Sequence, residues 1–147
     1  MTMLNDWTVD KIIEWNCDKF KKNNQTKQLK KIEEEITEFD EAEEKLEIWL
    51  ELADVYIAFA GLGRFSKVGG FVCDLFKANK NFDKLRKLIN LKMEENVTRT
   101  FDKNMHHKEN KPLGIKVIGT MNNWKKDAKG NWYKVAEPFE YITNKKD

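Results

Sequence analysis

The chain has 147 residues, which is enough for one domain with a substantial hydrophobic core. Its 27 basic and 25 acidic residues leave a net charge of +2, but eleven acids lie between Glu33 and Asp54, where Lys45 is the single base. Cys17 and Cys73 form no CxxC or metal-binding pattern, and no apolar run is long enough to span a bilayer. We therefore expect buried thiols, no signal peptide, no membrane span and a cytoplasmic protein.

Two amphipathic helices are expected at the start of the chain. No proline occurs before Pro112, so glycine and asparagine clusters are the main helix breaks. The first helix should begin after the cap residue Thr8 and end near Lys21, and the second should follow the polar break at residues 23–25. Residues at 3–4 spacing would form the buried stripes, which are Val9, Ile12, Ile13, Asn16 and Phe20 in the first helix and Leu29, Ile32, Ile36 and Phe39 in the second.

Three further helices are expected before the chain changes character. The most apolar one should run from about Leu46 to Leu62 and end at the glycines of residues 61–63. We expect a loop at residues 66–70, then a short helix, and a last helix from about Asn81 to Phe101. The short helix passes through Phe71, Val72, Leu75 and Phe76, and the last helix carries Phe82, Leu85, Leu88 and Ile89 inward.

The C-terminal tail has the pattern of a β-hairpin. Residues 114–121 and 132–135 are rich in β-branched and aromatic residues, and Asp127, Lys129 and Gly130 between them favour a turn. The expected fold is therefore all-α, an antiparallel bundle of four to five helices with a short C-terminal β-hairpin appendage. Residues 1–105 would form the helical domain, and residues 106–147 would form a tail that belongs to the same domain or is accessory to it.

Acidic side chains interrupt the most apolar predicted helix. Glu47, Glu51 and Asp54 lie at i, i+4 and i+7, so they share one narrow stripe of that helix. Buried carboxylates are costly unless they are paired or bind a metal ion. Glu35 and Glu38 form a second pair at i, i+3 on the preceding helix, and two facing pairs could surround one or two Mg²⁺ or Mn²⁺ ions. The alternative is burial of Glu51 and Asp54 beside Lys or Arg, with the remaining acids forming a solvated face.

Basic and amide side chains continue the inward stripe of the last helix. Lys92, Asn96 and Arg99 lie at i, i+4 and i+7, where they would face a cleft. Lysine and arginine there could neutralise phosphate oxygens, and the asparagine could donate a hydrogen bond. The alternative is that Lys92 and Arg99 pair with acids of the second and third helices.

These motifs resemble those of a known enzyme family. Gln28-x-x-Lys31-x-x-Glu34-Glu35-x-x-Glu38, followed after twelve residues by Glu51-x-x-Asp54, is similar to the EExxE…ExxD signature of the MazG-like all-α nucleoside triphosphate pyrophosphohydrolases. Lys92-x-x-x-Asn96-x-x-Arg99 is similar to that family's downstream basic element, and the resemblance covers about residues 25–101. It implies hydrolysis of a (d)NTP to the (d)NMP and pyrophosphate, with nucleotide-pool house-cleaning as a reasonable role, in a homodimer or homotetramer.

The resemblance assigns a role to each motif residue. The Mg²⁺ ligands, with Mn²⁺ as an alternative ion, would be Glu35, Glu38, Glu51 and Asp54. The proton acceptor for the attacking water would be Glu38 or Glu35, with Glu38 preferred by position. The residues that bind substrate phosphates would be Lys31, Lys92, Asn96 and Arg99. Glu34 points away from the apolar stripe, so we expect only a supporting role for it, for example as a charge partner of Lys31.

Recognition of the base would fall to the first helix and its surroundings. Asn16 lies on the apolar stripe, so it should be buried and need a partner, which could be a base or a neighbouring backbone carbonyl. Trp7 and Trp15 could stack on a base, whereas packing in the core or between subunits is the more common use of tryptophan.

Two other classes of function remain open. The first is a nucleic-acid-binding module based on the tail, where lysines interleave with aromatic residues. The residues concerned are Lys116, Lys125, Lys126, Lys129, Lys134, Trp124, Trp132 and Tyr133. A nucleic acid is not the expected main partner, because the acidic stripe would then serve no purpose. The second is a structural helical oligomer with buried Lys–Glu pairs, which dependence on Mg²⁺ would distinguish from an enzyme.

Overall fold

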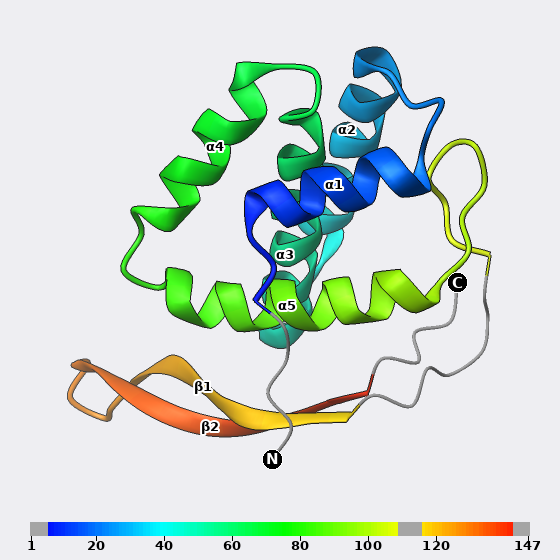
Figure 1. The fold of residues 1–147 in the computed structure, drawn as a ribbon. Helices are drawn as coiled ribbons and strands as arrows, with labels where there is room; N and C mark the ends of the chain where they lie inside the picture. The colour runs from blue at the N-terminus through cyan, green and yellow to red at the C-terminus, as the bar shows by residue number, and fades with distance from the viewer. Residues whose placement is uncertain (1–5, 109–115, 143–147) are drawn as a thin grey trace. The chain divides into compact units, whose positions relative to one another are not determined.

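A computed structural model describes residues 6–108 and 116–142, with side-chain surroundings for residues 6–108 and 125–135. These ranges contain five helices followed by a two-stranded antiparallel sheet (Figure 1). The expected fold class, a helical bundle with a C-terminal β-hairpin, is confirmed. The chain divides into two compact units, Met1–Lys108 and Glu109–Asp147, and each is described by itself.

The first two helices begin at side-chain caps. Helix α1 (Val9–Lys19) follows Thr8, whose Oγ1 accepts a hydrogen bond from the Lys11 backbone N–H at 3.2 Å. Helix α2 (Gln25–Glu41) follows Asn24, whose side chain accepts from the Lys27 backbone N–H at 2.9 Å. Such caps satisfy backbone donors that have no partner within the helix. The predicted start of α1 at Thr8 is thus correct, and the helix ends two residues before the expected Lys21.

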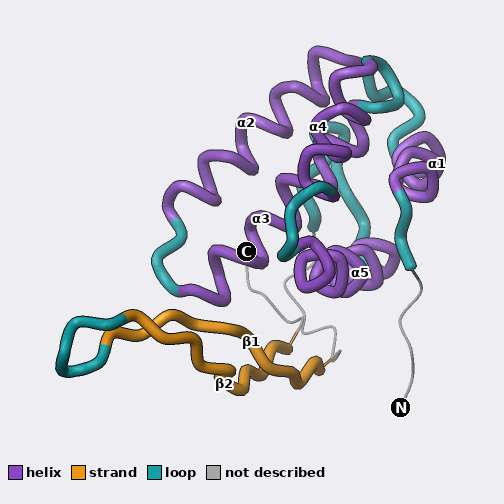
Figure 2. The backbone as a smooth tube through the Cα atoms, turned by 90° about the vertical axis from the view of Figure 1, so that its left-hand side faces the viewer, coloured by secondary structure: helices purple, strands orange, loops and turns teal. Residues whose placement is uncertain are grey.

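Helix α3 (Lys45–Leu62) is the centre of the helical unit. It contacts α1, α2, α4 and α5, and Figure 2 shows α2 running alongside it. Only three residues separate α2 from α3, so the two helices are antiparallel neighbours. The nearly continuous apolar surface of α3 explains its central position, because a helix that is apolar on all sides is stable only when other elements cover it.

Glycine allows α3 and α4 to approach one another closely. Helix α4 (Lys67–Lys77) starts inside the segment expected to be a loop, with Ser66 as its N-cap. Gly69 is buried in its first turn, and a Cβ atom there would lie 2.3 Å from the backbone nitrogen of Gly63. The expectation of a loop at residues 66–70 is therefore wrong, because the glycine serves close packing of two helices and not a turn.

Helix α2 turns a different stripe inward from the one predicted. Gln28, Ile32 and Glu35 are buried, whereas Leu29 and Ile36 are exposed. Ile32 belongs to both stripes, so the inward face is rotated by less than the 100° that separates consecutive residues. The polar residues can be buried because they find partners; for example, the Gln28 side chain donates to a backbone carbonyl of α3 at 2.9 Å. The prediction is correct for Ile32 and wrong for Leu29 and Ile36.

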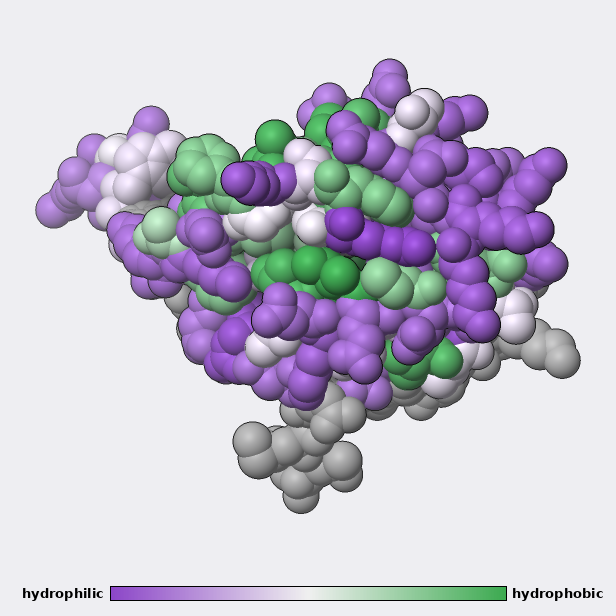
Figure 3. Space-filling model, turned by 45° about the horizontal axis from the view of Figure 1, so that its top comes forward, coloured by the Kyte–Doolittle hydropathy of each residue, from purple (hydrophilic) through white to green (hydrophobic). Residues whose placement is uncertain are grey.

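Helix α5 (Phe82–Thr98) closes the core, and α4 leaves apolar side chains outside it. Leu85, Leu88 and Ile89 of α5 are buried as expected. Val68, Phe71 and Leu75 of α4 lie at i, i+3 and i+7 and are each more than half exposed. A space-filling view shows hydrophobic surface among hydrophilic side chains on one face of the molecule (Figure 3).

The hairpin consists of β1 (Lys116–Lys126) and β2 (Trp132–Ile142), which pair along their whole length. Both strands extend beyond the expected segments, and residues 114–115 lie outside the described ranges. The turn is where it was predicted, with Gly130 at φ 87°. Pro138 lies within β2, which is tolerated because a two-stranded sheet has only edge strands. Within the described residues, no helix is both long and apolar enough to cross a bilayer.

Candidate metal centre

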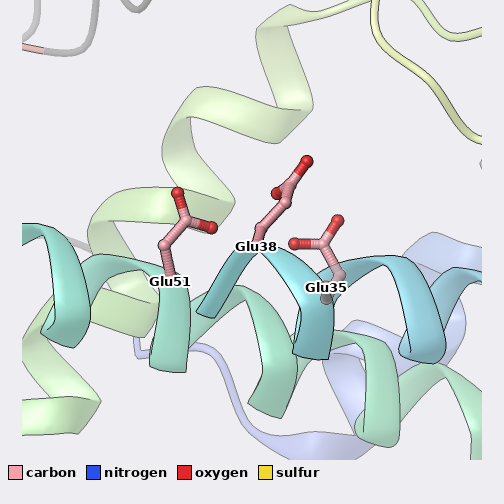
Figure 4. A group of neighbouring side chains, drawn as sticks. All are labelled: Glu35, Glu38 and Glu51. Carbon is pink, nitrogen blue, oxygen red and sulfur yellow. The ribbon is translucent and has the colours of Figure 1, made fainter. Parts of the chain in front are cut away.

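Three carboxylates converge where α2 and α3 lie side by side. Glu35 and Glu38 come from α2, one turn apart, and Glu51 comes from the facing side of α3. One oxygen from each residue lies within 4.8 Å of the other two. Figure 4 shows the three side chains projecting toward the same side of the two helices. The antiparallel pairing of the helices thus brings together acids that are 13 to 16 positions apart in the sequence.

The cluster is buried on one side and reachable from solvent on the other. Glu35 is 7% exposed and Glu51 is 3% exposed, whereas Glu38 is exposed. Burial of carboxylates among apolar residues is costly unless an opposite charge compensates it. An open side at Glu38 would let a hydrated cation reach the buried oxygens.

The protonation of Glu35 reflects this environment. Burial raises the pKa of Glu35 from 4.5 to about 8, and the neighbouring charges of Asp54 and Glu38 act in the same direction. The Lys31 ammonium, 3.1 Å from Glu35 Oε1, opposes the shift. Glu35 Oε2 is buried and accepts no hydrogen bond from any residue that the structure describes. An acceptor oxygen in that position matches the needs of a divalent cation.

Asp54 lies at the edge of this cluster. It is absent from the group of three mutually close acids, and its Oδ2 lies 3.3 Å from Nζ of Lys92. It is nevertheless near enough to raise the pKa of Glu35. Lys92 is buried, so pairing with an acid of α3, the alternative considered from the sequence, is what the structure records for it.

The four expected phosphate-binding residues fall into two pairs. Lys31 contacts Glu35 of the acidic cluster, and Lys92 contacts Asp54 at its edge. Arg99 instead pairs with Glu95 of its own helix, and the side chain of Asn96 donates to Met93 Sδ at 3.6 Å. Arg99 is buried with this partner, so the alternative considered from the sequence, pairing with acids of the second and third helices, does not hold for Arg99.

Glu95 is a buried acid that the sequence interpretation missed. Its side chain is fully buried, and Arg99 is its ion-pair partner. The signal in the sequence is its spacing, three residues after Lys92 and four before Arg99, which places it on the same face of α5. A buried acid on this face compensates one of the two cations there.

Glu34 has a different partner from the one proposed. Its Oε2 lies 2.9 Å from Nε2 of His106, whereas Lys31 pairs with Glu35. The segment that follows α5 therefore folds back onto α2. Phe101 of this segment also packs edge-on against Trp15 of α1, with ring centroids 5.8 Å apart.

The three expected base-binding residues have partners within the helical unit. Asn16 is buried in an amide network, donating to Gln28 Oε1 at 3.3 Å and accepting from Asn23 Nδ2 at 3.1 Å. Trp7 Nε1 donates to a carboxylate oxygen of α5 at 3.2 Å. Trp15 packs edge-on against two phenylalanine rings. The structure thus supplies Asn16 with side-chain partners, Trp7 with hydrogen-bond acceptors and Trp15 with ring contacts.

The three carboxylates of the cluster could hold a hard divalent cation. Carboxylate oxygens are the ligands that Mg²⁺ and Mn²⁺ prefer, and no histidine or cysteine belongs to the described group of three. Two lysines beside the acids could meet an anionic ligand of that cation. Comparison with protein-family models, curated proteins and solved structures found no match to this chain.

Proposed function

We propose that this protein is a Mg²⁺-dependent nucleoside triphosphate pyrophosphohydrolase that cleaves a (d)NTP to the (d)NMP and pyrophosphate. The observation that carries the proposal is the convergence of Glu35, Glu38 and Glu51 within 4.8 Å, with Lys31 and Lys92 beside them. The resemblance of the acidic and basic motifs to the MazG-like family agrees with this reaction. The enzyme would act on the cytoplasmic nucleotide pool, where house-cleaning is a reasonable role.

Each residue of the centre has a role in the proposal. Glu35, Glu38 and Glu51 would hold Mg²⁺, or Mn²⁺ in its place, and Asp54 would complete the set from its position at the edge. Bound there, the ion supplies charge neutralisation for the phosphates and a lowered pKa for a coordinated water. Lys31 and Lys92 would leave their carboxylate partners and bind phosphate oxygens of the substrate. There they would stabilise the negative charge that develops on the leaving pyrophosphate.

Proton transfer is assigned to the acids of α2. Glu38 is the exposed member of the cluster, so a water molecule that approaches the substrate can reach its carboxylate. Glu35 is the second candidate, but it is only 7% exposed, so a water molecule reaches its carboxylate less readily than that of Glu38. This difference in exposure favours Glu38 for the step.

Product analysis tests the proposal. The purified chain is incubated with each common ribo- and deoxyribonucleoside triphosphate and Mg²⁺, and the products are separated by ion-exchange chromatography. We expect monophosphate and pyrophosphate, with loss of activity in EDTA and in Glu51→Gln. Glu47→Gln is the matched control, because Glu47 lies one turn away on the same helix but is exposed.

The alternative products separate the competing functions. Diphosphate and phosphate would keep a metal-dependent hydrolase but move the attack to the γ-phosphorus, contrary to the proposal. Equal turnover by Glu51→Gln and Glu47→Gln would show that the acidic cluster takes no part in the hydrolysis. Turnover of no nucleotide, together with no stabilisation by Mg²⁺, would favour a structural helical oligomer.

A further inference from the structure

The tip of the hairpin, residues 125–135, exposes aromatic and basic side chains together. Trp132 is 64% exposed and Tyr133 is 46% exposed, although large aromatic side chains are usually buried or paired at an interface. Four exposed lysines share the same eleven residues, namely Lys125, Lys126, Lys129 and Lys134. This surface, here called the tip surface, belongs to the second compact unit and takes no part in the proposed hydrolysis.

The positive charge of the tip surface is not cancelled by its one acid. Asp127 is the single acidic residue between positions 125 and 135, so the segment carries a net charge of +3. Its Oδ1 accepts hydrogen bonds from the backbone N–H groups of Lys129 and Asn131, both at 2.9 Å. The carboxylate of Asp127 is thus hydrogen-bonded within the turn, and the lysines are the groups that would contact a negatively charged partner.

The hydrogen bonding of the turn preorganises this surface. The Asp127 backbone N–H donates to the carbonyl of Asn131 at 2.9 Å, and Gly130 takes the positive φ that the turn requires. Lys126 and Trp132 are directly paired in the register, with Lys126 Nζ 5.6 Å from the centroid of the Trp132 ring. The ammonium therefore lies over the indole ring, and the hairpin presents a cation and an aromatic side chain at the same place.

We propose that the tip surface binds single-stranded nucleic acid without base specificity. Trp132 and Tyr133 are consecutive in β2, so they lie on opposite faces of the hairpin. A base would stack on Trp132, and Lys126 and Lys134, which lie on the same face, would neutralise the adjacent phosphates. The observations favour this partner over two others. An acidic peptide would use the lysines but leave the aromatic faces unused, and a membrane surface would require a broader apolar face than these two rings provide.

The test uses the full-length chain, a fluorescein-labelled oligothymidylate of about 20 nucleotides and fluorescence anisotropy at low salt. Trp132→Ala should weaken binding about tenfold, because loss of one stacking platform has roughly that effect. Trp132→Phe should largely restore it, since a phenyl ring still stacks. The matched control is Phe71→Ala, which removes another exposed aromatic residue, 63% exposed, from the helical unit.

Salt dependence tests the role of the lysines. With four lysines available, the logarithm of the binding constant should fall against the logarithm of salt concentration with a slope of about −2 to −3. Lys129→Gln should make this slope shallower by about 0.7. Lys21 and Lys22, which are exposed in the turn after α1, should not affect the slope when changed to Gln.

Three results would overturn the proposal. The first is absence of oligonucleotide binding at low salt. The second is binding that Trp132→Ala and Lys129→Gln leave unchanged. The third is binding to vesicles of anionic lipid, lost in Trp132→Ala, without binding to the oligonucleotide, which would assign the tip surface to a membrane. Equal affinity for mixed-sequence and oligothymidylate strands would support stacking without base recognition.

Discussion

Glu35 provides a quantitative test of the acidic cluster, because its ionisation is coupled to folding. Burial, followed by the charge of Asp54, raises the pKa of this carboxyl in the folded protein from 4.5 to about 8. In the unfolded chain the group is solvated and titrates near the ordinary value. Replacement by Gln keeps the size of the side chain and removes its ionisation.

The sign and size of the effect follow from this difference. Below pH 4.5 both states are protonated, and the residue imposes no penalty. As the pH rises from 4.5 to about 8, the unfolded chain loses its proton while the folded protein keeps it, so the free energy of unfolding falls. Each pKa unit corresponds to about 1.4 kcal/mol, so the shift amounts to about 5 kcal/mol by pH 8. Relative to the wild type, Glu35→Gln should therefore gain up to about this much stability across that pH range.

Urea unfolding in EDTA, followed by the helical circular dichroism signal, measures this difference. The stability of Glu35→Gln minus that of the wild type should increase steadily from about pH 5 to about pH 8. Glu33→Gln is the matched control, because Glu33 lies on the same helix and is exposed. A constant difference for Glu35→Gln, or one that decreases with pH, would refute the assignment of a buried, protonated carboxyl.

Three further measurements test the metal site, the core and the surface. Mg²⁺ should raise the thermal unfolding temperature of the wild type but not of Glu51→Gln, and an equal shift in both would contradict metal binding at the cluster. Gly61→Ala should destabilise the protein by about 1–3 kcal/mol, because the new Cβ would lie 2.7 Å from Gln28 Nε2. At Gly70, in α4, a new Cβ would have no atom within 4 Å, so Gly70→Ala should instead stabilise the protein by up to about 1 kcal/mol. Similar changes in the free energy of unfolding for Gly61→Ala and Gly70→Ala, measured in urea, would disprove the close packing at Gly61. We expect a homodimer or homotetramer through the exposed face of α4, so Phe71→Asp should lower the mass in light scattering, and an unchanged mass would exclude that face.

The helices and the hairpin follow from interactions between residues that are close in the sequence. Examples are the Thr8 cap, the apolar composition of α3 and the Asp127–Gly130 turn. For this reason the helical bundle and the hairpin could be predicted from the chain. The spacing of Glu35 and Glu38 fixes them on one side of α2 for the same reason, since helix geometry leaves no other arrangement.

The partners of the site residues could not be predicted in the same way. Arg99 had acids available on three helices, and only the packed structure shows that it pairs with Glu95. Likewise Asp54 is held by Lys92 at the edge of the cluster, and Glu34 by His106. A long charged side chain reaches several candidates, and the choice among them depends on which are buried nearby after folding.

The orientation of α2 shows where the limit lies. The sequence by itself determined that this segment is a helix with an apolar stripe, because that periodicity is a local property. The tertiary structure decided that Gln28 and Glu35 face inward and that Leu29 and Ile36 face outward. The physical reason is that α1 and α3 supply hydrogen-bond partners to Gln28, and Lys31 of α2 itself pairs with Glu35. Burying these polar groups therefore costs less free energy than their hydropathy alone would indicate.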